Sequence, residues 1–280
     1  MKPGVKLFPP TKLAVEAMAL CCNDIDKSPV APSEVYNETW MLRMMLSFIH
    51  DYGDSDRIDN QCKELSCIAR AVRRNWISEG GLSPVFDKEG PTWADAILGN
   101  IKLDKQGETK RGVIIDCAND KDGVVVIEAK MNSALASGIT HASDYNQVVR
   151  NIACLAQLVM GKELAKNSAF FVFAPQRKIN VWTNDWKLGP KYLCGESEEC
   201  SGMVWEVIKN QIQTRNIKEP SVYDKFEDFG RTVKNIIANS KLISWESIIQ
   251  SFNCEEREFL KRFYVKTCGE YKIETDLGDW

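Results

Sequence analysis

A glutamate and a lysine directly follow an apolar run in the stretch VVVIEAKMNS, residues 124–133. Side chains alternate along a β-strand, so Glu128 and Lys130 are expected on one face, where a buried strand ends. A carboxylate there can bind a divalent cation, and the ammonium beside it can position a water molecule or stabilise charge on a phosphate. Charged residues are common at strand ends, so this pair needs further residues nearby before it indicates catalysis.

Two aspartates are candidates for a second metal ligand, and the sequence leaves both open. If the two strand runs that flank the turn ANDKDG form a hairpin, Asp116 lies diagonally opposite Glu128. Asp95, in PTWADAILG, is the alternative, although a plain three-strand meander would carry it toward the far end of the sheet. Two carboxylates and the backbone carbonyl of Ala129 would make an oxygen site for Mg²⁺, which Mn²⁺ can replace.

Two helical residues extend the candidate site. Glu38 falls on the apolar stripe of a helix expected over 33–52, where a carboxylate requires a cation or hydrogen-bond donors. The alternative is an ordinary acidic residue in the first helical turn. Gln147, near the start of a long helix over 144–166, could orient the lysine or a phosphate together with Arg150. A solvated helix face is the alternative for this pair.

Basic and aromatic residues offer candidate nucleic-acid contacts. Arg70, Arg73 and Arg74, in ARAVRRNW, would give sequence-independent, salt-sensitive binding if they face a groove, and otherwise form a solvated face. Trp93, close to Asp95, is the tryptophan that we would test for base stacking. The net charge of −3 argues against a generally basic coat but not against a local basic groove.

The hydrophobic pattern predicts one α/β domain over 1–280, with a core at about 34–175 and a helical C-terminal part at about 200–280. A loop is expected at 79–91 between the second helix and the first strand run. The three strand runs are expected to form a meander of hairpins. The expected order is helix 33–52, helix 57–78, strand runs 92–103, 111–117 and 123–131, helix 144–166, strand 168–175, and helices that include 202–213 and 257–265.

The cysteines and the apolar segments indicate the compartment. The chain has ten cysteines and two histidines, and no two cysteines form a CxxC pair, so a structural zinc site is a poor fit. The pattern favours reduced thiols and a cytoplasmic location. The apolar stretch at 12–22 carries Glu16 and is expected to be a helix rather than a signal peptide. No apolar run is long enough to cross a membrane.

Together these residues resemble the PD-(D/E)xK nuclease superfamily, which includes restriction endonucleases and RecB-like exonucleases. IEAK at 127–130 looks like its (D/E)xK element, and the order helix, three strands, helix, strand is similar to its α-β-β-β-α-β core with a mixed sheet. Glu38 would match a glutamate on the first core helix and would be a further metal ligand. Gln147 would match a glutamine on the helix that follows and would orient the site. The pattern EAK…YxQxxRN is also similar to a group of uncharacterised bacterial proteins of this superfamily.

The resemblance implies a Mg²⁺-dependent phosphodiesterase, a hydrolase that cleaves DNA. The sequence departs from the superfamily pattern in one respect: no proline directly precedes Asp95 or Asp116. The identity of the second metal ligand therefore stays open. One alternative is a catalytically silent nuclease-fold module that binds nucleic acid or a protein partner, and another is an RNA endonuclease. A homodimer is compatible with the sequence. The sequence does not separate endonuclease from exonuclease action.

Overall fold

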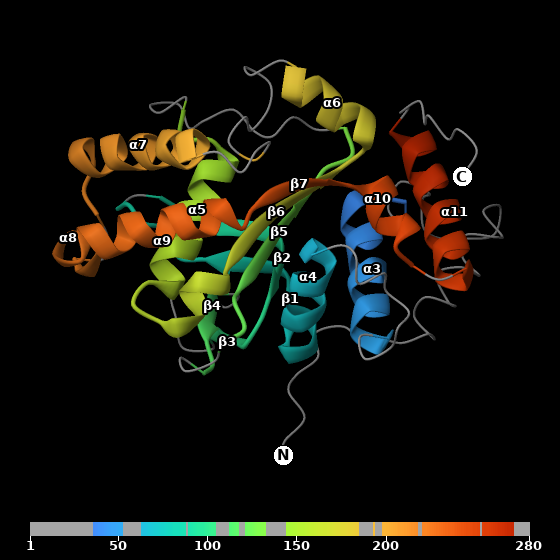
Figure 1. The fold of residues 1–280 in the computed structure, drawn as a ribbon, viewed down its shortest axis with the longest axis horizontal. Coiled ribbons are helices and arrows are strands. Elements are labelled where there is room, and N and C mark those ends of the chain that lie inside the picture. Colours follow the sequence, from blue (N-terminus) through green and yellow to red (C-terminus); the bar gives the residue numbers. More distant parts are fainter. Residues whose placement is uncertain are drawn as a thin grey trace.

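A mixed sheet of seven strands runs through the centre of the molecule (Figure 1). The computed structural model describes residues 36–52, 63–87, 89–104, 112–117, 121–132, 144–184, 193, 198–217, 220–252 and 254–271. The helix expected at 12–22 lies outside these ranges. Within them the strand order is β3-β4-β1-β2-β5-β6-β7. The expected α/β class is therefore confirmed.

The strands differ in how deeply they are buried. Every residue of β5 and β6 is buried, as expected for runs of valine, isoleucine and phenylalanine in the middle of a sheet. β5 is antiparallel to β2 and parallel to β6. The strands are β1 Trp76–Leu82, β2 Thr92–Leu98, β3 Ile101–Asp104, β4 Gly112–Ile115, β5 Val125–Ala129, β6 Ala169–Ala174 and β7 Lys241–Ser244.

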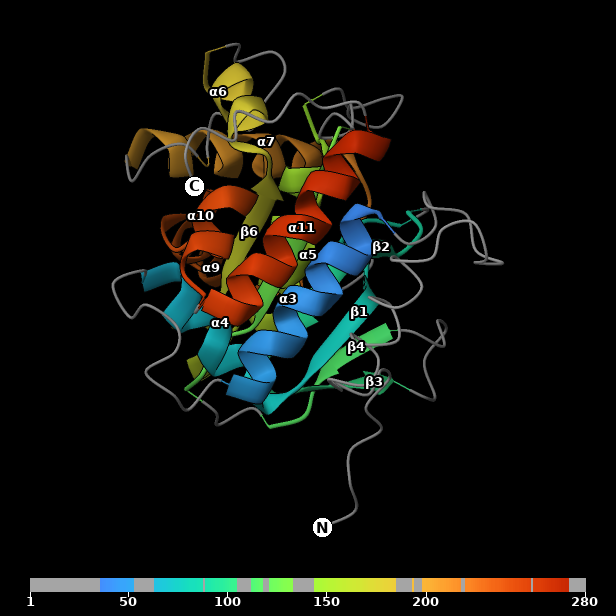
Figure 2. The same ribbon diagram turned by 90° about the vertical axis from the view of Figure 1, so that its right-hand side faces the viewer.

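Helices cover both faces of the sheet (Figures 1 and 2). α3, α4, α10 and α11 supply the apolar side chains against one face, and α5, α7 and α9 those against the other. The helices are α3 Glu38–Tyr52, α4 Lys63–Arg74, α5 Gln147–Val159, α6 Gln176–Asn184, α7 Glu198–Thr214, α8 Ser221–Asp224, α9 Phe226–Ala238, α10 Trp245–Gln250 and α11 Cys254–Glu270, with a 3₁₀ helix η2 at Glu163–Asn167. The two apolar cores hold the central strands from both sides.

The predicted meander is right for one hairpin and wrong for the other. β3 and β4 pair antiparallel, as expected, but the predicted run at 92–103 forms two strands, and its first part, β2, pairs with β1 and β5 instead. The run at 111–117 does not pair with the run at 123–131. β4 lies between β3 and β1 in the sheet, whereas β5 lies between β2 and β6. Burial explains the difference: β5 is apolar on both faces and takes a central place, whereas Ile114 of β4 is 37% exposed.

The predicted helix at 57–78 is too long, and the predicted loop at 79–91 begins too early. Within the described residues α4 ends at Arg74, and β1 starts two residues later. Ile77 and Leu82 of β1 are both buried in the core against α5 and its neighbours. Pairing with β2 along the whole of β1 outweighs the local helical pattern.

The C-terminal part contributes to the sheet as well as to the helical layers. β7 adds to the edge of the sheet in parallel with β6, although the sequence pattern indicated helices in this part. Among the described residues no helix has both the length and the apolar character needed to cross a membrane.

Candidate active site

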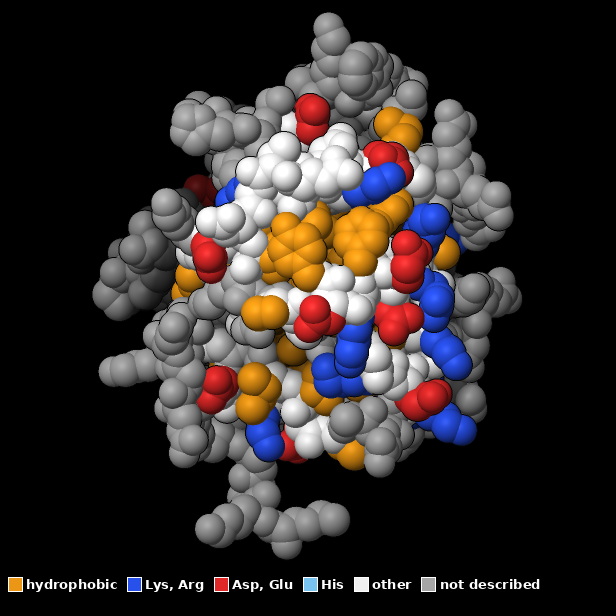
Figure 3. All heavy atoms as spheres, turned by 90° about the vertical axis from the view of Figure 1, so that its left-hand side faces the viewer, with side chains coloured by type: hydrophobic (Ala, Val, Ile, Leu, Met, Phe, Trp, Pro, Cys, Tyr) orange, Lys and Arg blue, Asp and Glu red, His pale blue; other side chains and the backbone are white. Residues whose placement is uncertain are grey.

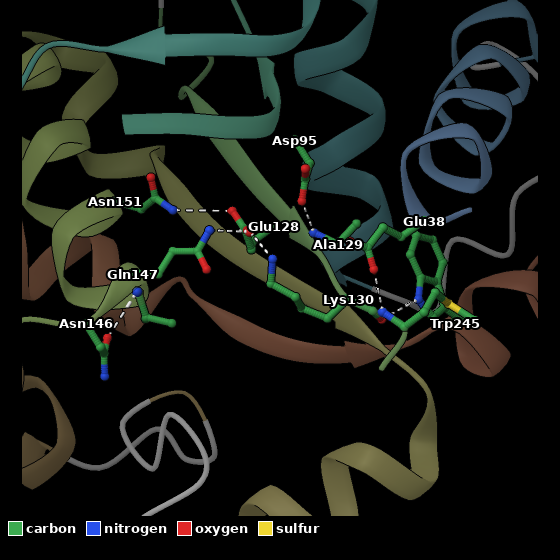
Figure 4. Close-up of polar contacts among 11 residues, drawn as sticks. Glu38, Asp95, Glu128, Ala129, Lys130, Asn146, Gln147, Asn151 and Trp245 are labelled. Carbon is green, nitrogen blue, oxygen red and sulfur yellow. Dashed lines mark hydrogen bonds and ion pairs between the residues drawn. The ribbon is translucent and has the colours of Figure 1, made fainter. Parts of the chain in front are cut away.

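Glu128 is the most heavily contacted charged residue at the end of β5 (Figure 4). Its Oε1 accepts hydrogen bonds from Lys130 Nζ and from Gln147 Nε2, the latter at 2.5 Å. Asn151 Nδ2 lies 3.4 Å from the other oxygen, Oε2. The side chain of Glu128 is 2% exposed and that of Lys130 is 10% exposed. Two residues of β5 and its extension thus meet two residues of α5 in a nearly enclosed polar cluster.

Asp95 lies beside Glu128 because of the strand register. β2 and β5 pair Ala96 with Ile127, which brings the two acidic residues to adjacent positions on neighbouring strands. Asp95 Oδ2 accepts the backbone N–H of Ala129 at 2.7 Å. The sheet therefore places the carboxylate of β2 at the end of β5, and Asp95 is the aspartate that the structure brings together with Glu128.

Glu38 reaches the same strand end from α3. It is the first residue of that helix, and its Oε2 accepts the N–H of Met131 at 2.8 Å. The backbone of Lys130 is held from two further elements: its N–H donates to Phe173 of β6 at 2.8 Å, and its carbonyl accepts Trp245 Nε1 of α10 at 3.2 Å. The chain that carries the candidate residues is thus fixed by four neighbouring elements.

The start of α5 explains why Gln147 faces the cluster. Asn146 caps the helix, and its side-chain oxygen accepts the N–H groups of Val148 and Val149, both at 3.1 Å. This cap fixes the residue at which the helix begins. Gln147 and Asn151, one turn apart, then lie on the same side of α5 and both reach Glu128.

Burial raises the pKa of the carboxyl groups in this cluster, and in Glu128 repulsion by a neighbouring carboxylate adds to it. Burial, followed by the neighbouring Asp95, raises the pKa of Glu128 to about 8. Burial also raises the pKa of Asp95 and of Glu38. Burial by itself would lower the pKa of Lys130, but contact with Glu128 outweighs it and the pKa is raised. A lysine pKa above its usual value means that the ammonium form is retained at neutral pH.

A third acidic residue stands in the same row across the sheet. β1 is in register with β2 on both sides of Glu79, so this residue faces Asp95. Glu79 has a φ of 55°, the left-handed region that side chains other than glycine rarely adopt. Arg43 of α3 binds it at 3.2 Å and binds Ser78 Oγ at 2.9 Å. Backbone strain of this kind occurs preferentially at functional sites.

Asp116 lies away from the cluster. It follows β4, which is separated from β5 by β1 and β2. Its carboxylate is half exposed and is 2.6 Å from Lys102 Nζ. The hairpin that would have brought Asp116 next to Glu128 does not form, so that expectation is wrong.

The predicted phosphate-binding arginines have different surroundings. Arg70, Arg73 and Arg74 are exposed on α4. Arg74 pairs at 2.8 Å with Asp122, which precedes β5, so this end of α4 is at the other end of the strand from Glu128. The six residues from Asp122 to Glu128 span roughly 15–20 Å of extended chain.

Arg150 binds within the protein. Its Nη2 donates to the carbonyl of Gly90 at 2.5 Å, and its Nε is 3.8 Å from Glu89. Glu89 also pairs at 2.6 Å with Arg215, which follows α7. Arg150 thus ties α5 to the segment before β2.

The described residues contain no group of three or more histidine, cysteine, aspartate or glutamate side chains arranged to hold a metal ion. Glu38 and Asp95 instead accept backbone N–H groups, and Glu128 accepts lysine and amide donors. The side-chain oxygens that could bind a metal ion at this strand end thus belong to the adjacent Asp95 and Glu128, and Glu38 lies on the other side of Lys130 (Figure 4).

The structure adds residues that the sequence pattern had not assigned to the site. Asn151 follows Gln147 by four residues, so helical spacing could have identified it. Glu79 was placed in a predicted loop, and Trp245 is distant in the chain, so neither gave a local signal.

Comparisons with protein-family models, with curated proteins and with solved structures found nothing that matches this chain.

Proposed function

We propose that the protein is a divalent-cation-dependent nuclease that hydrolyses phosphodiester bonds, with DNA as its substrate. The observation that carries this proposal is the placement of Asp95 and Glu128 at adjacent positions on neighbouring strands, next to the ammonium of Lys130. Asp95 raises the pKa of the neighbouring Glu128, because two carboxylates so close together ionise unfavourably unless positive charge enters between them. A function that supplies such charge explains why the acidic pair is kept there.

The oxygen donors suit Mg²⁺, with Mn²⁺ as a substitute. Asp95, Glu128 and the carbonyl of Ala129 would hold the ion. In a strand the N–H and C=O of one residue point to the same side, and the N–H of Ala129 points to Asp95. A small set of protein oxygens fits a cation that retains several waters. When bound, the ion would lower the pKa of a coordinated water and neutralise charge on the phosphate.

The other residues of the cluster have separate roles in this proposal. Lys130 supplies a permanent positive charge at Glu128 and would stabilise the phosphate oxygens or position the attacking water. Gln147 and Asn151 fix the orientation of the Glu128 carboxylate. Glu38 holds the backbone N–H of Met131 and keeps the strand extension in place. Glu38 and Asp95 themselves are partly exposed.

The arrangement of elements supports a restriction-endonuclease-like core as part of the proposal. α3, β1, β2, β5, α5 and β6 follow the order helix, three strands, helix, strand that the resemblance implied, with α4 added after α3 and with β3 and β4, the latter within the predicted strand run at 111–117, inserted between β2 and β5. In this arrangement the first of the three core strands is β1 at 76–82, and the second carries Asp95. Asp95 takes the place of the superfamily aspartate although Ala94, not proline, precedes it.

DNA binding is expected to be local to the site. The net charge is −3. On the face formed by α8, α9 and their neighbours, lysine and arginine side chains alternate with aspartate and glutamate around a small apolar group (Figure 3). No continuous basic surface covers the described residues on this face. At the candidate site itself we expect the cation and Lys130 to contribute to phosphate binding.

Cleavage assays test the proposal directly. Purified protein is incubated with linear, circular and single-stranded DNA, and with RNA, in Mg²⁺ or Mn²⁺. We expect cleavage of at least one DNA substrate, and loss of cleavage in Lys130→Ala. Lys102→Ala is the matched control, because this lysine is half exposed on β3, and it should retain activity. Equal behaviour of wild type and Lys130→Ala on every substrate would show that catalysis does not occur at this site.

A second candidate function is a catalytically silent module that binds nucleic acid or a protein partner. It is favoured by the hydrogen bonds of Lys130, Gln147 and Asn151, which already occupy the oxygens of Glu128. Calorimetric titration with Mn²⁺ separates the two functions. Binding that disappears in Asp95→Asn, which keeps the acceptor for the Ala129 N–H, supports the nuclease, and absence of binding in the wild type supports the silent module.

A further inference from the structure

Trp93 presents a large aromatic surface close to the candidate active site. It lies in β2, and it is the one residue of that strand that is exposed, at 46%. Large aromatic side chains in the middle of a sheet are normally covered by a helix or by neighbouring side chains. Leaving an indole ring in water is unfavourable, which prompts the question of what covers it.

The cross-strand neighbours of Trp93 leave its ring open. On one side β1 places Gly81 opposite it, and glycine has no side chain with which to cover the ring. On the other side the recorded pairing of β2 with β5 ends at Ala96 and Ile127, and the side chain of Lys130, further along the chain, turns toward Glu128. Side chains directly opposite on adjacent strands usually pack together. Here the two described neighbours provide no such contact.

The position of Trp93 relative to the acidic pair is fixed by the strand. Trp93 precedes Asp95 by two residues, a separation of about 7 Å along an extended chain. β2 runs antiparallel to β5, so this direction leads outward from Glu128, beyond the end of β5. The backbone of Trp93 is therefore about as far from that of Asp95 as a nucleobase is from the phosphate of its own nucleotide.

We infer that Trp93 is a stacking platform for an unpaired nucleobase of the strand that is cut at Asp95 and Glu128. This inference rests on the proposed nuclease function and specifies its substrate. A base within a duplex is already stacked on both faces, so it can stack on Trp93 only when it is single-stranded, frayed or flipped out. The substrate is thus a nucleic acid with an unpaired nucleotide at the scissile phosphate.

Binding measurements test the inference without requiring turnover. Fluorescence anisotropy is measured with a labelled single-stranded oligonucleotide and with a closed hairpin duplex, in Ca²⁺ in place of Mg²⁺. Trp93→Ala should weaken single-strand binding about 5- to 100-fold, the usual effect of removing one base–aromatic stack. Trp93→Phe should restore most of the affinity. Met203→Ala, which removes a side chain 40% exposed on α7, is the matched control and should have no effect.

Abasic substitutions locate the stacked base. A series of oligonucleotides, each with one abasic position, should show one position at which wild-type affinity falls as much as in Trp93→Ala. The same oligonucleotide should cause no further loss with Trp93→Ala, because the two changes remove the same contact. Independent losses that multiply would contradict stacking of that base on Trp93.

Three results would overturn the inference. One is equal single-strand affinity for wild type and Trp93→Ala, and another is an equal loss with the closed duplex. The third is a later elution of Trp93→Ala than of wild type on size-exclusion chromatography, which would show that Trp93 lies between two copies of the chain. The proposed function fails separately, if Lys130→Ala cleaves as well as wild type. If the wild type binds no oligonucleotide, both proposals fail.

Discussion

Replacing Asp95 by asparagine should make the protein more stable and inactive at the same time. Asp95 lies beside Glu128 on the neighbouring strand, and burial raises the pKa of both carboxyl groups. Asparagine keeps the shape of the side chain, and its oxygen can still accept the N–H of Ala129. The substitution thus removes charge while preserving the hydrogen bond that ties β2 to β5.

The expected gain follows from the repulsion that is removed. Two unit charges roughly 5 Å apart repel by about 3 kcal/mol at an effective dielectric constant of about 20. Lys130, the N–H of Ala129 and, near neutral pH, protonation of Glu128, whose pKa is about 8, offset part of this repulsion. We therefore expect Asp95→Asn to raise the free energy of unfolding of the metal-free protein by about 1–2 kcal/mol. For a chain of this size this corresponds to a rise in Tm of about 2–8 °C.

Differential scanning calorimetry in EDTA measures this gain, and cleavage assays in Mg²⁺ measure the loss of activity, expected to be at least about 10³-fold. Wild type should gain further stability when Mn²⁺ is added, and Asp95→Asn should not. Asp116→Asn is the matched control, because the same chemical change at an exposed ion pair should alter neither property appreciably. A lower Tm for Asp95→Asn, or retained activity, would refute the reasoning.

Three further predictions concern local structure. Asn146→Ala should lower the free energy of unfolding by about 1 kcal/mol in urea titrations, because two N–H groups lose their cap. Gly230→Ala should destabilise by about 1–3 kcal/mol, because its new Cβ would lie 2.9 Å from a buried indole ring. Gly269→Ala, which has open space, should stabilise by about 0.5–1 kcal/mol; equal signs for the two would contradict this. Burial raises the pKa of Cys154 to about 11, so roughly 0.1% of this thiol is thiolate at pH 8. Iodoacetamide should therefore label the exposed Cys117 and spare Cys154, as mapped by mass spectrometry. Labelling of both cysteines would contradict this prediction.

Local patterns predicted the elements that carry the candidate site better than they predicted how those elements pair. The helical periodicity around Glu38 and Gln147, and the apolar run before Glu128, correspond to α3, α5 and β5. The choice between Asp95 and Asp116 depended on strand pairing instead. Strand pairing is set by burial over the whole sheet, and a hairpin between sequential strands is only the commonest outcome.

Residues that act through long-range contacts gave the weakest sequence signal. Glu79 has a left-handed backbone in the middle of a strand, which no local preference of glutamate predicts. Trp245 reaches the carbonyl of Lys130 from a helix more than a hundred residues later in the chain. Such contacts arise only when the sheet and both helical layers are assembled, so a pattern within a short window does not contain them.

The double use of the acidic residues determines which substitutions report on catalysis. Glu38 and Asp95 accept the N–H groups of Met131 and Ala129, so they also hold the last part of β5 and its extension. An alanine at either position leaves a partly buried N–H without its acceptor, which costs about 1–3 kcal/mol and confuses lost structure with lost chemistry. An amide keeps the acceptor and removes the charge. Loss of activity in the amide variants together with unchanged or raised stability therefore reports on the charge itself, which is the property that the proposed nuclease requires.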